Sequence, residues 1–574
     1  MNTDNYFSIL FCGEGRRYKR LSDTAFHDLG LDTVLKSFTD DPKEQKMIAD
    51  VLSEMTPDPE TARYRSEVFS DIAALPELRE KMCALFERME FIRSFGIMHK
   101  TMDKELGLWH LFHRMEELGD YIECVESMQD CLADDRIRSR GLLALREHIA
   151  GLYEDACFAE MKQDITSLRV KASEVKSVTL GINVNERFEA VSMGLVSVNS
   201  KPFKRSGIVG SFADAIASKD RLSSTEEWNG DMRYYPIDSA SDGRFAAAVE
   251  KQAAFMAPRI MPFVDARTKS TIVGTAEGDG AKGSTFYLEA TINKMLGSLV
   301  KRLRDTLTKY ANVAVMSISQ LLPEFTYYIR AVEFVEKCRA KGFDFCKAQP
   351  SDEKGMMNAR GFYNLKLALT LDSPEELVKN DLDFDEAHTV YILTGANRGG
   401  KTTATQAVGL LFVLAQAGMD VPAEGFEFSP ADCIYTHFPA DEDKTVDLGR
   451  LGEECVRFRE IYTESSNDSL MLLNETFSTT SFEEGCYIAK DSVRALLRKR
   501  VRTIYNTHMH RLAADLGELG SDGAGAVSLT VRTDAGKRSF RLELASPEGL
   551  SYAHDIAEKY GVTYELLTAP EGLT

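Results

Sequence analysis

The chain has 574 residues, enough for more than one domain and a large buried core. Hydrophobic residues make up 44% of it and charged residues 28%, as in ordinary soluble proteins, and the formal net charge of −20 excludes a general basic field that would draw it to nucleic acid. The 10 cysteines include no C-x-x-C pair, which favours free thiols in a reducing cytoplasm over zinc sites or disulfides. No signal peptide begins the chain, and no run is long enough to span a membrane. We therefore expect a soluble cytoplasmic protein that does not enter a membrane.

The first part of the chain has a helical pattern. Apolar residues recur at helical spacing from Leu21 to about Ala172, and turns between helices are marked by Pro42, Pro57, Pro59 and Pro76. Within this stretch two histidines lie near two glutamates, a combination that can hold a metal ion: His110, His113, Glu116 and Glu117. A polar helix face is the favoured interpretation, because no further group of metal-binding side chains follows.

The pattern changes at Val178. The alternating segments VTLGINVN and VSMGLVSVN flank the turn-like NERFEA and predict a β-hairpin over 178–199. A polar excursion follows at about 200–284, and a long helix begins at about Thr285. Two basic clusters are Lys201, Lys204 and Arg205 near the start of the excursion, and Lys301, Arg302 and Arg304 on the helix. A solvated basic face is the default reading of such charges, and a surface that follows nucleic-acid phosphates is the alternative.

The most informative stretch is 388–403, HTVYILTGANRGGKTT. Thr389–Thr394 is a short apolar and β-branched run that predicts a buried strand, and 403–417 predicts an apolar helix. The P-loop pattern G-x-x-x-x-G-K-[ST] lies between them, formed by Gly395, Ala396, Asn397, Arg398, Gly399, Gly400, Lys401 and Thr402, with Thr403 next. Glycines let backbone N–H groups surround a phosphate, Lys401 would reach the β- and γ-phosphates, and the Thr402 hydroxyl would ligate Mg²⁺. The stretch therefore predicts binding of ATP with Mg²⁺.

A second strand carries the expected acidic residue. The apolar run at 470–473 ends in Asn474 and Glu475, where ABC-type ATPases have Asp-Glu. The Asp there holds Mg²⁺ through water and the Glu polarises the attacking water, so we assign Glu475 to catalysis. Asn474 keeps an oxygen that can accept a hydrogen bond from a metal-bound water, but it carries no charge. At the end of the next apolar strand, His508 is the candidate sensor of the γ-phosphate, with His510 as the lesser candidate.

Taken together, these motifs resemble those of the MutS family of DNA mismatch-repair ATPases. TGANRGGKTT is similar to the family's TGPNxGGKST, LLNETFSTTS stands where the family has an LxDExGxGTS-like segment, and NTHMHRL resembles ATHxxEL. SYAHDIAEKYGV is similar to the family's closing SYGxxVAxLAGV. The resemblance covers most of the chain and is strongest from Asn380-Asp381 onward. It implies an ATPase that dimerises and presents an S-x-F-x-x-E signature to the partner's nucleotide. Here the signature positions are Gly449, Leu451 and Glu454, so only the glutamate is kept, and the Gly449 N–H is the group left to replace the serine hydroxyl.

The chain also departs from the family. We find no room before the helical core for the mismatch-reading and connector domains, and no nuclease-like domain at the end. Phe158-Ala159-Glu160 has the letters of the family's mismatch-reading triplet, but it lies in a helical stretch and we interpret it as a chance match. The expected fold is multi-domain: an α-helical core and lever region with a small β element at 1–359, then an ABC-type α/β P-loop ATPase domain at 360–574.

The expected function is that of a MutS-type ATPase, in which ATP binding and hydrolysis close a homodimeric clamp on DNA other than a classical mismatch. One alternative is a nucleotide-gated scaffold whose slow hydrolysis only sets the dimer lifetime, which Asn474 and Gly449 favour. Another is a family member that acts on RNA or the ribosome.

Overall fold

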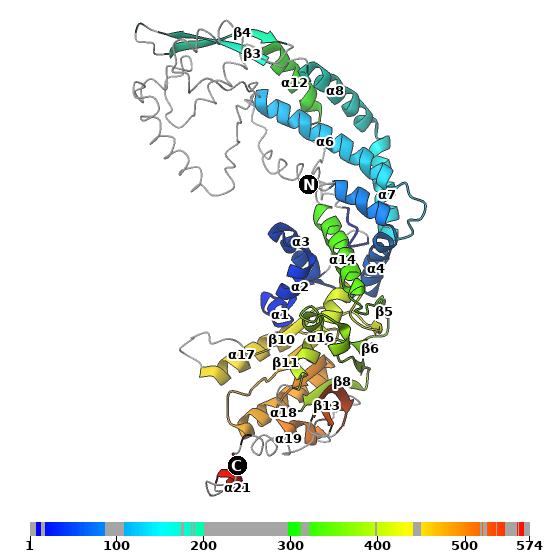
Figure 1. The fold of residues 1–574 in the computed structure, drawn as a ribbon, viewed down its shortest axis with the longest axis vertical. Helices are drawn as coiled ribbons and strands as arrows, with labels where there is room; N and C mark the ends of the chain where they lie inside the picture. Colours follow the sequence, from blue (N-terminus) through cyan, green and yellow to red (C-terminus); the bar gives the residue numbers. More distant parts are fainter. Residues whose placement is uncertain are drawn as a thin grey trace. The chain divides into compact units, whose positions relative to one another are not determined.

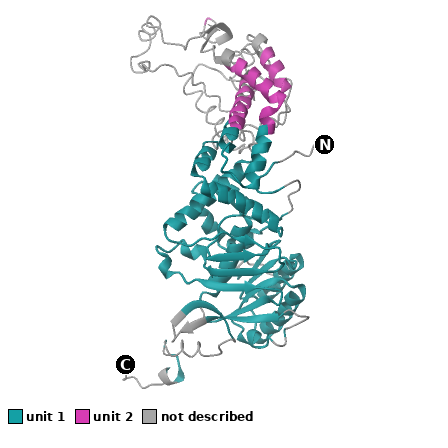
Figure 2. Cartoon of the chain, turned by 90° about the vertical axis from the view of Figure 1, so that its right-hand side faces the viewer, with its two compact units in different colours: residues 1–89, 127–150, 317–574 teal, residues 90–126, 151–316 magenta. Residues whose placement is uncertain are grey.

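The computed structural model describes residues 7–12, 18–85, 108–173, 177–184, 186, 190–199, 297–310, 321–395, 399–439, 449–516, 519, 525–534, 537–545, 560 and 562–567. The chain divides into two compact units (Figure 2). Unit 1 comprises residues 1–89, 127–150 and 317–574, and unit 2 comprises residues 90–126 and 151–316. The domain boundary that we expect at residue 360 was drawn from the sequence motifs, whereas the two units are defined by compactness. The boundary therefore stays a prediction.

A six-stranded sheet forms the centre of the C-terminal part of unit 1 (Figure 1). In spatial order its strands are β10 Ile434–His437, β11 Leu470–Asn474, β12 Arg502–Asn506, β8 His388–Thr394, β13 Gly525–Asp534 and β14 Lys537–Leu544. The first five run parallel, and β14 pairs antiparallel with β13. Strands β8, β10, β11 and β12 are buried along nearly their whole length, as parallel strands covered on both faces are. Their carboxyl ends meet at one edge of the sheet, where parallel sheets place ligands.

Helices connect and cover these strands. They are α16 Lys401–Gln416, α17 Gly449–Glu464, α18 Phe482–Lys499 and α19 His510–Ala514, and the short helix α21 Tyr564–Leu567 follows the last strand. The strand and the helix predicted on either side of the glycine loop are confirmed, with α16 beginning at Lys401. Helix α18 begins at the Ser481 cap and ends at Arg500, which adopts a left-handed conformation with φ of 58°. The strands predicted before Glu475 and His508 are β11 and β12, and both are confirmed.

A smaller four-stranded sheet lies in the same unit, in the order β5-β9-β6-β7. Its strands are β5 Gln349–Pro350, β9 Gly425–Phe428, β6 Met357–Phe362 and β7 Asn380–Phe384. Strand β6 pairs antiparallel with both β7 and β9, and the short helix α15 Leu365–Ala368 and the 3₁₀ turn Pro374–Glu376 join β6 to β7. The Asn364 side chain caps α15 and also donates to the Thr403 carbonyl at 2.8 Å, which ties this connection to the first turn of α16.

Unit 1 also contains a group of helices nearer the N-terminus. They are α1 Asp23–Asp28, α2 Leu31–Phe38, α3 Pro42–Leu52, α4 Pro59–Ala74, α7 Arg140–Glu154 and α14 Leu322–Ala340. Asp41 and Asp58 cap α3 and α4, and Pro42 and Pro59 occupy the first helical position, where a missing N–H costs nothing. Helix α14 packs on α2, α3 and α4 (Figure 1). The predicted helical character of this region is confirmed, and three of the four prolines, Pro42, Pro59 and Pro76, begin helices.

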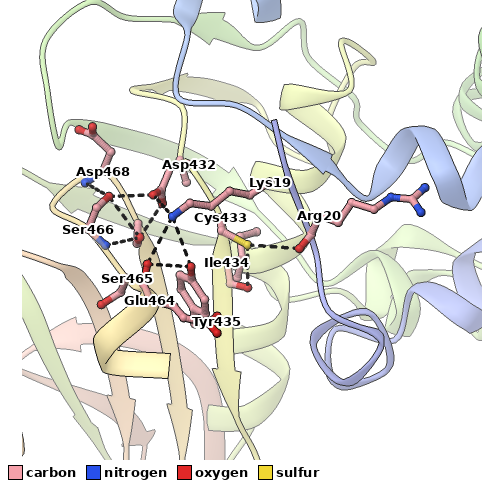
Figure 3. Close-up of polar contacts among 12 residues, drawn as sticks. Lys19, Arg20, Asp432, Cys433, Ile434, Tyr435, Glu464, Ser465, Ser466 and Asp468 are labelled. Atoms are coloured by element: carbon pink, nitrogen blue, oxygen red, sulfur yellow. Dashed lines mark hydrogen bonds and ion pairs between the residues drawn. The ribbon is translucent and has the colours of Figure 1, made fainter. Parts of the chain in front are cut away.

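The N-terminal segment is bonded to the large sheet. The strand β1 Lys19–Arg20 pairs with β2 Glu54–Met55, and Lys19 Nζ lies 2.6 Å from an oxygen of Asp432, just before β10 (Figure 3). The same carboxylate accepts from the Ser469 hydroxyl at 2.5 Å. Hydrogen bonds from Lys19 and the serines outweigh the cost of burial and hold the pKa of Asp432 below its ordinary value, so this carboxylate stays charged.

The C-terminal end of the P-loop helix is anchored by Arg65 of α4, which is 0% exposed. Its guanidinium donates to the Gln416 carbonyl at 2.9 Å and to the Leu10 carbonyl at 3.0 Å. The Gln416 side chain in turn donates to the Thr56 carbonyl at 2.9 Å. Because α16 begins at the glycine loop, these bonds fix the helix that carries Lys401.

Unit 2 contains long helices and a hairpin. Its described elements include α6 Leu108–Leu132, which continues into unit 1, α8 Ala156–Ser173, β3 Ser177–Val184, β4 Ala190–Asn199 and α12 Gly297–Lys309. Strands β3 and β4 pair antiparallel, which confirms the predicted hairpin. Phe158 to Glu160 lie within α8, as expected for a chance match. No helix among the described residues combines the length and the apolar character that crossing a bilayer requires.

The possible metal group of α6 has other partners where it is described. Glu116 lies 2.8 Å from Arg169, and Glu117 lies 2.8 Å from Arg114. These ion pairs agree with the polar-face interpretation. The side chains of His110 and His113 lie outside the described residues.

Candidate functional site

The glycine loop joins β8 to α16 in a conformation that needs glycine. Gly395 has φ of 138° and Gly400, the N-cap of α16, has φ of 90°. A Cβ on Gly395 would lie 3.3 Å from the backbone nitrogen of Val531, so strand β13 also leaves little room for a side chain there. Ala396, Asn397 and Arg398 lie outside the described residues. Gly399, Gly400, Lys401, Thr402 and Thr403 are described, and all five line one cavity.

Lys401 is buried at the start of α16, with 5% of its surface exposed. Its Nζ donates to the Gly395 carbonyl at 3.0 Å, so the side chain folds back along the loop. Burial lowers the pKa of Lys401, and the negative charge of Glu475 acts in the opposite direction. A buried ammonium that lines a cavity is suited to bind an anion, because it has little water to lose.

Three polar side chains meet at the carboxyl ends of β11 and β12. Thr402 Oγ1 donates to Asn474 Oδ1 at 3.0 Å, and Asn506 Nδ2 also donates to Asn474 Oδ1. Asn474 and Asn506 are opposite each other in the parallel register of the two strands. A carbonyl oxygen has two lone pairs, and both of those on Asn474 Oδ1 are used here. Asn474 can therefore accept from a metal-bound water only if Thr402 or Asn506 gives up its bond.

Glu475 follows directly in an unusual conformation. Its φ is 55°, in the left-handed region that few residues other than glycine adopt, and its N–H donates to the Asn506 carbonyl at 2.9 Å. Its carboxylate lies 2.8 Å from Nε2 of His508, and both residues line the cavity with Lys401. Strained backbone of this kind is held by its surroundings and occurs often at functional sites. His510, the lesser candidate, does not line the cavity, and burial lowers its pKa.

The cavity itself has a volume of about 500 Å³. Its lining combines the P-loop residues with an apolar wall. This wall consists of Phe540 from β14 and of residues from the smaller sheet and its connections: Phe362, Tyr363, Leu367, Leu377 and Val378. Sequence reasoning missed this second wall. Phe540 on β14 is 44% exposed with φ of 57°, and its ring lies over Gly400. Asn380 holds β14 in place, because it accepts from Leu542 N at 2.7 Å and donates to the Phe540 carbonyl at 3.3 Å.

The three signature positions lie together on α17, away from this cavity. Gly449 begins the helix with φ of 65°, Leu451 packs against the core behind the sheet, and Glu454 accepts from the Thr479 hydroxyl at 3.1 Å. Burial raises the pKa of the Glu454 carboxyl. None of the three lines the cavity of its own chain.

The basic clusters are described only in part. Lys301, Arg302 and Arg304 are exposed on α12, whose buried face includes Leu303 and Leu307. Lys201, Lys204 and Arg205 lie outside the described residues.

Two family models match this chain. The model for MutS domain V matches residues 391–569, and the model for the MutS2 N-terminal domain matches residues 57–340. The chain belongs to the MutS family. The first match begins within β8 and includes Lys401, Glu475 and His508, which line the cavity. The resemblance read from the motifs is thereby confirmed.

Curated MutS relatives are similar at modest identity. "Endonuclease MutS2" of Thermus thermophilus is 25% identical over 308 residues, which are 53% of this chain and 40% of the relative. The protein of the same name from Bacillus velezensis is 25% identical over 307 residues, 52% of this chain and 38% of the relative. That of Caldanaerobacter subterraneus subsp. tengcongensis is 23% identical over 499 residues, 84% of this chain and 57% of the relative. The matches thus span about two fifths to three fifths of these relatives' own length.

Proposed function

We propose that this chain binds ATP with Mg²⁺ and hydrolyses it as a MutS-type ATPase. The observation that carries the proposal is the cavity of about 500 Å³, which has the P-loop and Lys401 on one side and Glu475 with His508 beside them. Its size and its division into a polar and an apolar wall suit a nucleotide, with phosphates at the N-terminus of α16 and the base against Phe540. In this proposal residues 360–574 form an ABC-type ATPase domain and residues 1–359 a core and lever region.

The residues present fit Mg²⁺ as well as ATP. The Thr402 hydroxyl donates its one hydrogen to Asn474, and its oxygen accepts from Asn506 Nδ2 at 3.3 Å, which leaves one lone pair for a metal ion. Asn506 Oδ1 is buried without a hydrogen-bond partner among the described residues, so an acceptor is left over beside the site. Mg²⁺ neutralises phosphate charge when bound. Lys401 binds the β- and γ-phosphates, Glu475 orients and polarises the attacking water, and His508 holds the Glu475 carboxylate in position.

The proposal extends to a homodimer with shared sites. Gly449, Leu451 and Glu454 match the family's signature segment but do not reach the cavity of their own chain, as expected for residues that act on a partner's nucleotide. Bound ATP would then belong to the interface, and a ligand that binds only the dimer shifts the equilibrium toward it. Glu475→Gln should slow hydrolysis, so dimer should accumulate with ATP but not with ADP. Equal sedimentation of this variant with ATP, with ADP and without nucleotide would refute the shared site.

DNA is the proposed partner of the clamp. The exposed Lys301, Arg302 and Arg304 supply a local basic surface on a chain of net charge −20, so binding should rest on few phosphate contacts and fall modestly with salt. Reversing these three charges should weaken binding to duplex and branched DNA alike. The nuclease activity in the relatives' names belongs to those proteins, and this proposal rests on the nucleotide cavity alone.

A second candidate function is a nucleotide-gated scaffold with slow hydrolysis. It is favoured by the Asn474 oxygen, whose two lone pairs are both taken. The ATPase rate measured without nucleic acid and with duplex, mismatched, branched and RNA ligands separates the candidates. Stimulation by one DNA structure supports the clamp, stimulation by RNA alone supports an RNA-acting member, and a slow rate that no ligand changes supports the scaffold.

A further inference from the structure

A buried histidine bridges the signature helix and the catalytic strand end. His437, the last residue of β10, is 3% exposed. Its Nε2 lies 3.3 Å from the Glu454 carbonyl on α17, and its Nδ1 lies 3.1 Å from the Thr476 hydroxyl. Thr476 follows Glu475 directly in the chain. One imidazole therefore touches both the helix assigned to the partner's nucleotide and the loop that carries the chain's own catalytic carboxylate.

The bridge has a defined hydrogen-bond direction. Burial lowers the pKa of His437 to about 4, so the ring is neutral near pH 7 and carries a single N–H. The Glu454 carbonyl can only accept a hydrogen bond, so the proton lies on Nε2. Nδ1 is then an acceptor, and the Thr476 hydroxyl donates to it. Neither bond can be exchanged for water, because both His437 and Thr476 are buried.

The loop at the other end of the bridge is conformationally sensitive. Glu475 and Phe477, on either side of Thr476, both have positive φ, at 55° and 62°. Such residues keep their conformation only while neighbouring contacts hold them. The Thr476 hydroxyl contacts the His437 ring and also the His437 carbonyl at 3.4 Å. The Thr476 carbonyl accepts from the Tyr505 hydroxyl at 2.9 Å. A displacement of α17 that pulls on His437 therefore acts on Thr476, the residue next to Glu475.

A second contact runs in parallel with the first. The Thr479 hydroxyl donates to the Glu454 side chain at 3.1 Å, so Glu454 is joined to this loop through its carboxylate and through its backbone. Other contacts keep α17 in place without reaching the loop, among them Arg457 Nη1, which donates to the Phe438 carbonyl at 2.9 Å. Removal of the imidazole should leave the helix attached while its connection to Glu475 is weakened.

We propose that His437 is a positioning residue that couples the two nucleotide sites of a dimer. When α17 engages the partner's ATP, the path Glu454–His437–Thr476 brings the chain's own Glu475 into its hydrolytic position. Dimer closure would then switch on hydrolysis in both chains, rather than merely trap nucleotide. The inference rests on the proposed shared-site ATPase and adds to it the route by which one site controls the other.

The test compares full-length variants of the bridge with a matched control. His437→Phe keeps a buried ring without its hydrogen bonds, and Thr476→Val removes only the hydroxyl. The control is Thr503→Val on β12, which also removes a buried hydroxyl, here bonded to the Val501 carbonyl at 3.0 Å within its own strand. Thr476→Val keeps the test decisive if the larger change prevents folding. The ATPase rate per chain is measured over a wide range of chain concentrations, alongside sedimentation with ATP and the equilibrium affinity for ATP.

In the wild type and in Thr503→Val, the rate per chain should rise as dimer forms. Both bridge variants should still dimerise and keep the wild-type ATP affinity, while their rate stays flat and the limiting kcat falls about tenfold, with KM little changed. A bridge variant whose rate rises with concentration as in the wild type overturns the coupling role alone. A wild type that never dimerises with ATP overturns the shared site, and the coupling role with it.

Discussion

Asn474→Asp is the sharpest test of how this site handles its metal ion. The Asn474 oxygen already accepts from Thr402 and Asn506, and the amide nitrogen beside it can only donate. A metal-bound water presents hydrogens to its neighbours, so it finds no free acceptor on this residue. Aspartate replaces the NH₂ group by a second oxygen with two lone pairs and adds a negative charge next to the proposed metal site.

The size of the effect follows from that added acceptor. A hydrogen bond to a charged group contributes about 1.5–3 kcal/mol, so Mg²⁺ should bind about 10- to 150-fold more tightly. The same charge is costly without metal, because residue 474 is only 7% exposed. The variant should therefore be less stable than wild type when free and should recover its stability when Mg²⁺ and ATP are added.

The assay is steady-state phosphate release by the full chain at saturating ATP, over a titration of Mg²⁺. The half-saturating Mg²⁺ concentration should fall at least about tenfold, and the limiting rate should rise. Asn467→Asp is the matched control, since it makes the same change in the exposed turn that precedes the opposite end of β11. An unchanged or higher Mg²⁺ requirement in Asn474→Asp would refute the reasoning. A rate that falls at saturating Mg²⁺ would show a site built around the amide, and would favour the scaffold.

Three further outcomes are expected. Lys401→Ala should abolish ATP binding, because a buried charged contact contributes about 2–5 kcal/mol. The circular dichroism spectrum of the variant should remain that of the wild type, and wild-type ATP affinity in this folded variant would refute the proposed nucleotide site. Phe540→Ala should weaken ATP affinity by about 1–3 kcal/mol through loss of base stacking, whereas Phe540→Tyr should bind ATP about as tightly as the wild type. Equal affinities of the wild type and both variants in a fluorescence titration would show that the base binds elsewhere. His437 has a folded pKa of about 4, below its unfolded value, so stability is complete above about pH 6.5 and falls as pH drops toward 4. The free energy of unfolding, measured with urea, should fall by on the order of 3 kcal/mol in the wild type and not in His437→Phe. The same dependence of unfolding free energy on pH in both proteins would contradict this expectation.

The sequence by itself determined the local parts of this protein. The strand and helix beside the P-loop, the strands that precede Glu475 and His508, the hairpin of unit 2 and the polar face of α6 each depend on neighbouring residues, so spacing and residue type were sufficient to predict them. The MutS resemblance likewise rests on short motifs, because a glycine loop followed by Lys-Thr must keep its order to bind a phosphate. The positions of Lys401, Glu475 and His508 along the chain followed from the same motifs.

Only the tertiary structure decided which residues from distant segments contact the predicted site residues. Asn506 is not part of any motif, and it limits Asn474 because the parallel register of β11 and β12 sets the two residues opposite each other. Phe540 lies far from Gly400 in sequence, yet strand pairing through β13 brings its ring over the loop. His437 reads as one more buried strand residue until α17 and the Thr476 loop pack against it. In each case the deciding contact joins distant segments, and sequence periodicity reports which face of an element is buried but not which partner covers it.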